Sequence, residues 1–178
     1  MRSMTALLII DVQEKLFPLI ERREEFLENL QKVIAGFHIL GLPIYVTEQY
    51  PAGLGNIISE VRHALGPGQI YFSKTTFSCL GDERIREILL DQKISQWVMV
   101  GIEAHVCVLQ TVKEFLNAGK DVTVLNDAIS SRSIYDYSTA IAEMRDLGAR
   151  ISSTETILFE LVRDSKAPEF KQISQLIK

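Results

Sequence analysis

The sequence has few of the features that would place it in a specialised class of protein. Its 178 residues include only two cysteines, Cys79 and Cys107, and three histidines. Two cysteines are too few for the disulfide framework of a small secreted domain, and no CxxC or paired HxH motif is present for zinc. The longest apolar runs, such as residues 6–10, are far shorter than the roughly 20 residues of a membrane-spanning helix. We therefore expect no disulfide scaffold and no membrane span.

An excess of charge of one sign is also missing. The chain has 19 Lys and Arg residues against 23 Asp and Glu residues, a net charge of −4, and the basic residues are scattered. Such a pattern lacks the basic patch with which proteins bind nucleic acid. An acid and a glutamine follow the first apolar run, where a signal peptide would need small residues for cleavage. We expect a cytoplasmic protein without a nucleic-acid or membrane partner.

The rest of the composition, 47% hydrophobic and 24% charged, is that of an ordinary globular protein. The length suits one domain over residues 1–178, with a core that needs no disulfide or metal. Six short apolar runs alternate with longer segments of helical periodicity. The runs, which we predict to be strands, are residues 5–10, 43–47, 69–73, 97–101, 121–125 and 149–152.

Apolar residues at helical spacing predict helices between these runs and near the C-terminus. The predicted helices are residues 21–40, 82–90, 105–117, 134–147, 154–162 and 167–177. The runs are mostly apolar at consecutive positions, which is typical of strands that are covered on both faces. We therefore predict an α/β fold, an open and mostly parallel six-stranded sheet with helices on both faces, as in Rossmann-like three-layer sandwiches.

Reactive side chains follow three of the predicted strands, at the edge where α/β sheets place their ligands. Asp11 follows the first strand, Lys74 follows the third, and the segment IEAHVC, which ends in Cys107, follows the fourth. A carboxylate could accept the thiol proton while an ammonium stabilises the thiolate. The start of a helix would also lower the pKa of the thiol. This arrangement could make Cys107 a nucleophile.

Each of these residues also has a simpler interpretation. A lone cysteine on a helix that faces a sheet is usually a core residue. Asp11 could cap a helix or belong to a turn, and Lys74 could be solvated. Cys79 is expected to be a small buried thiol, with redox pairing to Cys107 as a less favoured alternative. Spacing alone therefore favours an enzyme and a non-catalytic protein about equally.

Three motifs in this order, IIDVQ, SKTTFS and GIEAHVCV, resemble those of the isochorismatase-like cysteine hydrolases. The segments TEQYPAGLG, NDAISSRS and APEFKQISQLIK are most similar to the branch of isochorismatase domain-containing proteins, so the resemblance covers essentially the whole chain. It implies a triad in which Cys107 is the nucleophile, Asp11 the general base and Lys74 the cation that holds both in their charged states. It also implies cleavage of a C–N bond in a small amide or ureido compound through a thioester.

The resemblance implies further features around the triad. A cis peptide bond between Ile102 and Glu103 would let the backbone N–H groups of Glu103 and Cys107 form an oxyanion hole. Asp127 would support the site by hydrogen bonding from behind the triad, and the Glu103 carboxylate is expected at the pocket mouth, where it would repel anionic substrates. Residues that flank the triad in sequence are expected to line the pocket, with core packing as the alternative for the aromatic ones. They are Gln13, Phe17, Tyr50, Phe77 and His105.

Family members that hydrolyse nicotinamide carry an aspartate and histidines for a metal after the second strand. This chain has TEQYPAGLG there, in which Glu48 is the only strong ligand, so we expect no metal, no other cofactor and no nicotinamide hydrolysis. Members that act on isochorismate lack the cysteine, so that activity is not expected either. A homo-oligomer is expected by resemblance. The main alternative is a catalytically silent, oligomeric binding or scaffolding protein.

Overall fold

The computed structural model describes residues 4–90 and 93–178, and these form one six-stranded sheet flanked by helices. The strands are β1 (Thr5–Ile10), β2 (Ile44–Gln49), β3 (Tyr71–Lys74), β4 (Gln96–Ile102), β5 (Asp121–Ser130) and β6 (Arg150–Ser152). Their order in the sheet is β3-β2-β1-β4-β5-β6, and every pair of neighbours is parallel. The predicted open α/β fold is confirmed.

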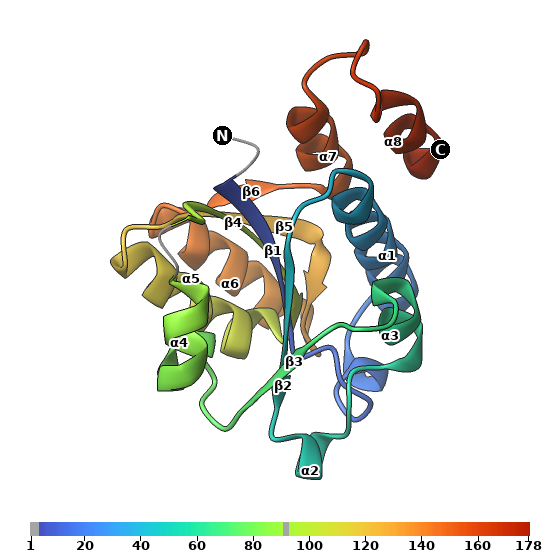
Figure 1. Ribbon diagram of the computed structural model, residues 1–178. Coiled ribbons are helices and arrows are strands. Elements are labelled where there is room, and N and C mark those ends of the chain that lie inside the picture. Colours follow the sequence, from blue (N-terminus) through green and yellow to red (C-terminus); the bar gives the residue numbers. More distant parts are fainter. Residues whose placement is uncertain (1–3, 91–92) are drawn as a thin grey trace.

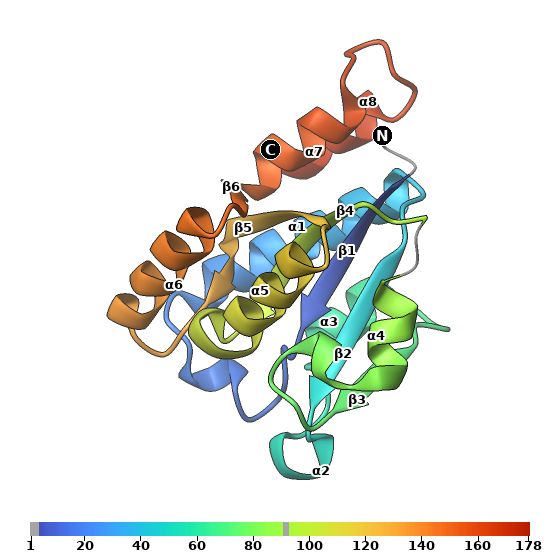
Figure 2. The ribbon, with the colours of Figure 1, turned by 90° about the vertical axis from the view of Figure 1, so that its left-hand side faces the viewer.

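Helices cover both faces of this sheet. They are α1 (Arg23–Ile39), α2 (Pro51–Leu54), α3 (Ser59–Leu65), α4 (Glu83–Leu89), α5 (Leu109–Asn117), α6 (Ile134–Asp146), α7 (Thr154–Val162) and α8 (Phe170–Ile177). Figure 1 shows α1, α3, α7 and α8 on one side of the sheet, and α4, α5 and α6 on the other. Figure 2, turned by 90°, confirms that α4, α5 and α6 lie in front of the strands. The molecule is therefore a three-layer sandwich.

Side chains of the central strand β1 alternate between the two cores. Leu7 and Ile9 pack among residues of α1, α3, α7 and α8, whereas Leu8 and Ile10 pack among residues of α4, α5 and α6. The six residues of β1 are all buried. Because both faces of the strand are covered, consecutive positions are apolar, as the sequence indicated.

Two of the strands, β2 and β5, run further toward the carboxyl edge of the sheet than predicted. β2 continues to Gln49 instead of ending at residue 47, and β5 continues to Ser130 instead of ending at residue 125. Each extension begins with two polar residues, Glu48 and Gln49 in β2 and Asn126 and Asp127 in β5, so the apolar pattern ended before it. The short helices α2, of four residues, and α3, of seven, were also not predicted.

Gly101 allows β1 and β4 to approach each other closely near the site. A Cβ atom on Gly101 would lie 2.1 Å from the carbonyl oxygen of Ile10, and its φ is +124°. Only glycine fits such a position without displacing the backbone. β4 continues one residue beyond this glycine, to Ile102. The close contact brings the end of β1, which leads to Asp11, next to the turn that carries Cys107.

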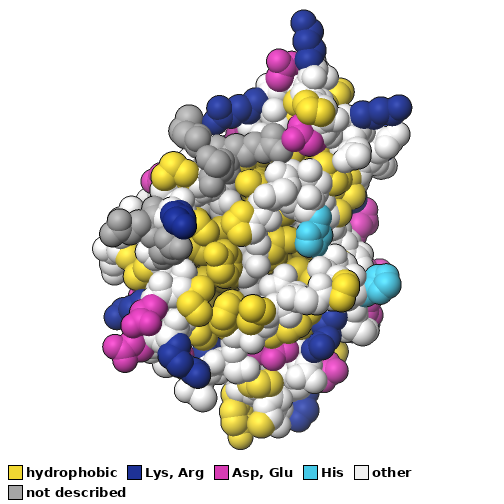
Figure 3. All heavy atoms as spheres, viewed as in Figure 1, with side chains coloured by type: hydrophobic (Ala, Val, Ile, Leu, Met, Phe, Trp, Pro, Cys, Tyr) yellow, Lys and Arg dark blue, Asp and Glu magenta, His cyan; other side chains and the backbone are white. Residues whose placement is uncertain are grey.

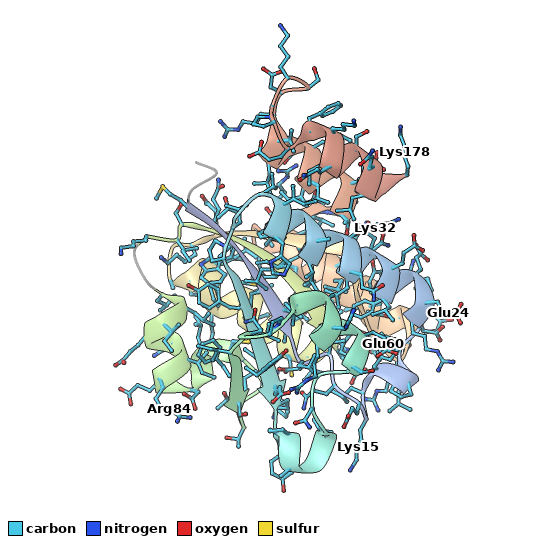
Figure 4. The ribbon with its side chains drawn as sticks, turned by 45° about the vertical axis from the view of Figure 1, so that its right-hand side comes forward. Lys15, Glu24, Lys32, Glu60, Arg84 and Lys178 are labelled. Carbon is cyan, nitrogen blue, oxygen red and sulfur yellow. The ribbon has the colours of Figure 1, made fainter. Side chains whose placement is uncertain are left out.

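The outer surface carries charged side chains, and the face shown in Figure 3 also carries an apolar area. In Figure 4 the labelled charged side chains point away from the ribbon: Lys15, Glu24, Lys32, Glu60, Arg84 and Lys178. Figure 3 shows hydrophobic side chains gathered on the face where Figure 1 places β2 and β3. Ile70 and Phe77, which flank the edge strand β3, are 64% and 53% exposed. None of the helices in the described ranges is both long and apolar enough to cross a bilayer.

Candidate active site

A buried ion pair joins Asp11 and Lys74 at the carboxyl edge of the sheet. Lys74 Nζ lies 2.7 Å from Asp11 Oδ2, and neither side chain is exposed. Asp11 directly follows β1, Lys74 is the last residue of β3, and β2 lies between these strands. Lys74 is therefore not solvated, and the Asp11 carboxylate binds the ammonium and does not cap a helix.

The Lys74 ammonium is surrounded by oxygen atoms. Besides Asp11, it donates to Gln49 Oε1 at 2.9 Å and to the carbonyl oxygens of Thr76 and Phe77 at 3.1 and 2.9 Å. Burial is the largest single effect and lowers the pKa of Lys74. The charge of Asp11, the two cysteines and the hydrogen bond with Asp11 together outweigh it, so the pKa is raised. Lys74 is therefore a permanently charged, fixed cation at neutral pH.

Thr47 supports the other oxygen of the Asp11 carboxylate. Its hydroxyl donates to Asp11 Oδ1 at 2.8 Å, and the residue is fully buried in β2. Thr47 pairs in the sheet with Ile10, the residue before Asp11. Thr47 is not among the residues that the sequence motifs indicate. A hydroxyl within a buried apolar strand needs a hydrogen-bond partner, and that requirement was the available signal.

Cys107 lies beside this pair on a π-helical turn, Ala104–Val108, that precedes α5. The residue is 5% exposed. Burial raises the pKa of its thiol, the charge of Asp11 and a side-chain hydrogen bond with Asp11 raise it further, and Lys74 only partly opposes them. The prediction that a helix start lowers this pKa is wrong, because desolvation and the carboxylate dominate. The resting site therefore holds a neutral thiol, a carboxylate and an ammonium.

The turn between β4 and Cys107 is tied to the segment after β5. The Ile102–Glu103 peptide bond is cis. The Glu103 carboxylate accepts hydrogen bonds from the backbone N–H of Arg132 at 3.2 Å and from its Nε at 3.0 Å. The Glu103 side chain is only 8% exposed. The expectation that it reaches the pocket mouth as a free anion is wrong, because Arg132 pairs with it.

Two of the predicted pocket residues have structural contacts instead. Gln13 is fully buried, and its amide donates to the carbonyl oxygens of Gln49 and Gly55 at 2.8 and 2.7 Å. Its Oε1 accepts from the backbone N–H of Gln49 at 2.7 Å, so the whole amide fixes the loop after β2. Phe17 packs against Phe26 with ring centroids 6.2 Å apart and contacts the core.

Of the other three predicted pocket residues, Tyr50 and Phe77 lie near Lys74, whereas the contacts of His105 are with other segments. Tyr50 lines a cavity of about 210 Å³ that also reaches Lys74. The Phe77 side chain is 53% exposed, and its carbonyl oxygen binds Lys74. His105 Nδ1 lies 2.9 Å from Ser131 Oγ, so the ring contacts the segment after β5.

The Asp127 carboxylate, which the resemblance places behind the triad, makes its hydrogen bonds to the start of α7. Its carboxylate accepts hydrogen bonds from the backbone N–H of Thr154 at 3.0 Å and from the Thr154 hydroxyl at 2.9 Å. Asp127 lies in the part of β5 that extends beyond the prediction, and Thr154 is the first residue of α7. These bonds therefore connect the end of β5 to the start of α7.

Glu48, the one strong ligand expected after the second strand, accepts a hydrogen bond from the backbone N–H of Ile57 at 2.8 Å. Within residues 4–90 and 93–178, no group of three or more His, Cys, Asp or Glu side chains is arranged to hold a metal ion. The donor set of the site consists instead of one carboxylate, one ammonium and one thiol. Such a set fits acyl transfer to sulfur.

Comparison with known proteins gives a consistent assignment. The family model described as isochorismatase domain matches residues 5–156. The secreted isochorismatase effector Isc1 of Phytophthora sojae is 37% identical over 177 residues, which cover 98% of this chain and 84% of that protein. Isochorismatase domain-containing protein 1 of Salmo salar is 35% identical over 174 residues. The alignment covers 98% of this chain but only 61% of that longer protein.

Solved structures of the same shape are also known. The structure of MAR1 ribonuclease from Caenorhabditis elegans superposes with a TM-score of 0.92 at 37% identity, covering 99% of this chain and 90% of that one. The YcaC gene product of Escherichia coli, described as an octameric hydrolase of unknown specificity, has a TM-score of 0.92 at 20% identity, covering 99% of this chain and 87% of that one. The second likeness concerns the fold alone.

Proposed function

We propose that this chain, which belongs to the isochorismatase family, is a cysteine hydrolase that cleaves the C–N bond of a small amide or ureido compound. The resemblance seen in its motifs is confirmed at the level of the family and of the domain-containing branch. The observation that carries the proposal is the buried Asp11–Lys74 ion pair, 2.7 Å long, whose two charges both act on the pKa of the Cys107 thiol.

The first step transfers the thiol proton and forms a carbon–sulfur bond. Because the resting thiol of Cys107 is neutral, Asp11 takes its proton as the sulfur attacks the substrate carbonyl carbon. The carbonyl oxygen becomes negatively charged in the tetrahedral adduct. We assign its stabilisation to the backbone N–H groups of Glu103 and Cys107, since preformed donors of this kind contribute about 3 kcal/mol each.

The second step breaks the C–N bond and then releases the acyl group. Asp11 returns its proton to the departing nitrogen, so the amine leaves neutral and a thioester with Cys107 remains. A water molecule then gives one proton to Asp11 and its oxygen attacks the thioester. The acid leaves, and the proton returns to the sulfur. Lys74 remains charged throughout and stabilises the negative charge shared by Asp11 and Cys107.

The proposed function is accompanied by three further proposals, on oligomeric state, cellular location and metal dependence. We propose that it self-associates, as one neighbour of the same fold is described as octameric, and sedimentation velocity should give a mass above the 20.1 kDa monomer. We propose a cytoplasmic location, although one relative is named as secreted. We also propose that the chain needs no metal, and dialysis against a chelator should leave its reactivity toward substrates unchanged.

Covalent trapping tests the proposed reaction directly. The protein is incubated with a library of small amides and ureido compounds, and intact-mass spectrometry with peptide mapping locates any acyl adduct. We expect an adduct on Cys107 that is lost in Cys107→Ala, in Lys74→Met and in Asp11→Asn. Lys32→Met is the matched control, because Lys32 pairs with Glu28 on the outside of α1.

Three outcomes would contradict this proposal. Hydrolysis that persists in Cys107→Ala would exclude the cysteine mechanism. Cleavage of RNA by the wild-type protein, with no reaction of the amides, would point to the activity named for the nematode structure. No reaction with any compound, in a protein whose Cys107 does not label with a thiol reagent, would favour a binding or scaffolding role.

A further inference from the structure

We propose that Cys79 and Thr47 form a hydrogen-bond relay that positions the Asp11 carboxylate toward Cys107. In this relay the Cys79 thiol donates to the Thr47 hydroxyl, and that hydroxyl donates to Asp11. Both are positioning residues, because neither would touch the substrate. The effect of the relay on turnover rests on the proposed function. The contacts that form the relay do not.

The first branch of the relay leads from Cys79 to the general base. Cys79 Sγ lies 3.6 Å from Thr47 Oγ1, which lies 2.8 Å from Asp11 Oδ1. Cys79 and Thr47 are both fully buried, so water cannot replace either partner. Asp11 Oδ2 is already bound by Lys74, so Thr47 and Lys74 hold the two carboxylate oxygens from opposite ends. A carboxylate held in this way has a fixed orientation.

The second branch leads from Cys79 to the nucleophile. The backbone N–H of Cys79 donates to Thr111 Oγ1 at 3.0 Å, and the Thr111 hydroxyl donates to the carbonyl oxygen of Cys107 at 2.7 Å. Thr111 is fully buried as well. Cys79 is thus anchored to the turn that carries the catalytic thiol, and one residue connects the base and the nucleophile.

The number of available protons fixes the direction of each bond. A threonine hydroxyl has one proton. The Thr47 proton goes to Asp11, which has none to give while it is ionised beside Lys74. The Cys79–Thr47 contact must then use the thiol proton, so Cys79 is the donor. Burial raises the pKa of Cys79 to about 11, so this proton is present at neutral pH.

Removing the Thr47 hydroxyl should therefore change the acidity of Cys107 as well as the packing. A hydroxyl dipole directed at the carboxylate stabilises the negative charge of the site. Without it, the charge on Asp11 is less dispersed and holds the Cys107 proton more strongly. The pH at which Cys107 becomes reactive then rises, by about half to one pH unit for one hydrogen bond to a charged group.

The test is the pH profile of Cys107 alkylation by iodoacetamide, with peptide mapping to separate the two cysteines. We expect Thr47→Val to move the midpoint to higher pH and to slow labelling at pH 8 about threefold to tenfold. Thr47→Ser should restore the wild-type profile because it keeps the hydroxyl. Thr156→Val, which removes a hydroxyl from the exposed start of α7, is the matched control and should leave the profile unchanged.

Cys79 is tested by a double-mutant cycle in the same assay. Cys79→Ala should shift the midpoint in the same direction as Thr47→Val, but by less. Cys79→Ser, which keeps a proton donor, should keep the wild-type midpoint. In a protein that already carries Thr47→Val, Cys79→Ala should cause no further shift. A profile of Thr47→Val that superposes on the wild type overturns the relay, as do additive effects of the two changes. Labelling requires no substrate, so this test is independent of the test of hydrolysis. The relay can be disproved in a protein that turns over substrate, and it can be supported in a protein that does not.

Discussion

Asp11 acts on Cys107 in two opposite ways. As a base it takes the thiol proton during attack, but in the resting site its charge and hydrogen bond keep that proton on the sulfur. The geometry therefore favours deprotonation that is coupled to attack, and the sulfur does not carry a standing negative charge. This differs from the thiolate that the sequence suggested, because the sequence does not reveal how far the site is desolvated.

We therefore expect Asp11→Asn to label faster with iodoacetamide at pH 8 while its turnover is lost. Removing the carboxylate charge lowers the pKa of Cys107, and we expect a rate increase of about threefold or more. Circular dichroism checks that the variant is folded. Asp121→Asn is the matched control, since Asp121 lies exposed at the start of β5 on the opposite edge of the sheet. Unchanged or slower labelling of Asp11→Asn would contradict this account.

Lys74→Met should have the reverse effect on the same reaction. The ammonium lowers the pKa of Cys107, so its loss should slow labelling at every pH below the new midpoint. The Lys32→Met variant, on the surface of α1, should label at the wild-type rate. Faster labelling of Lys74→Met would show that the cation does not act on the thiol.

At the scale of secondary-structure elements, Asp127 fastens β5 to the start of α7. We predict that Asp127→Ala lowers the free energy of unfolding in urea by about 1–2 kcal/mol, as for the loss of a helix cap. The alkylation rate of Cys107 should not change, because the described bonds of this carboxylate go to Thr154. A stable variant with altered Cys107 labelling would instead support the role behind the triad that the resemblance implied.

The elements also show which parts of the site a sequence can predict. Asp11, Lys74 and Cys107 could be found because each lies close after an apolar run, and parallel strands place their carboxyl ends at one edge. Thr47 and Gln49 could not be found in this way, because they lie within β2 and their partners, Asp11 and Lys74, come from other parts of the sheet. Gln13 was predicted to line the pocket from its place in the sequence alone. In the structure its amide binds the backbone of Gln49 and Gly55, contacts that the sequence does not indicate.

The whole molecule should lose stability in alkali. Folding raises the pKa of Cys79 to about 11, and it also raises those of Cys107 and Lys74 above their ordinary values of 9.0 and 10.5. The folded state then holds more protons than the unfolded state above pH 9. Their contribution is complete below pH 9 and declines as pH rises. Each thiol contributes a slope of about 1.4 kcal/mol per pH unit between its unfolded and folded pKa.

Urea unfolding at pH 8, 9, 10 and 10.5 measures this effect. We expect the free energy of unfolding to be nearly constant from pH 8 to 9 and to fall above pH 9. In Cys107→Ala the decline should be shallower by about 1.4 kcal/mol per pH unit, because one of the proton-holding groups is gone. Stability that rises above pH 9, or an equal slope in both proteins, would contradict the assigned pKa shifts.

The sequence by itself determined the class of fold, the family and the three residue types of the proposed triad. These follow from local properties, namely apolar runs, helical periodicity and short motifs, which can be recognised in the sequence without the fold. Only the tertiary structure decided the protonation of Cys107, the pairing of Glu103 with Arg132 and the contacts of Asp127 and Thr47. Each of these depends on burial and on charges brought together from distant strands, and both are properties of the packed chain.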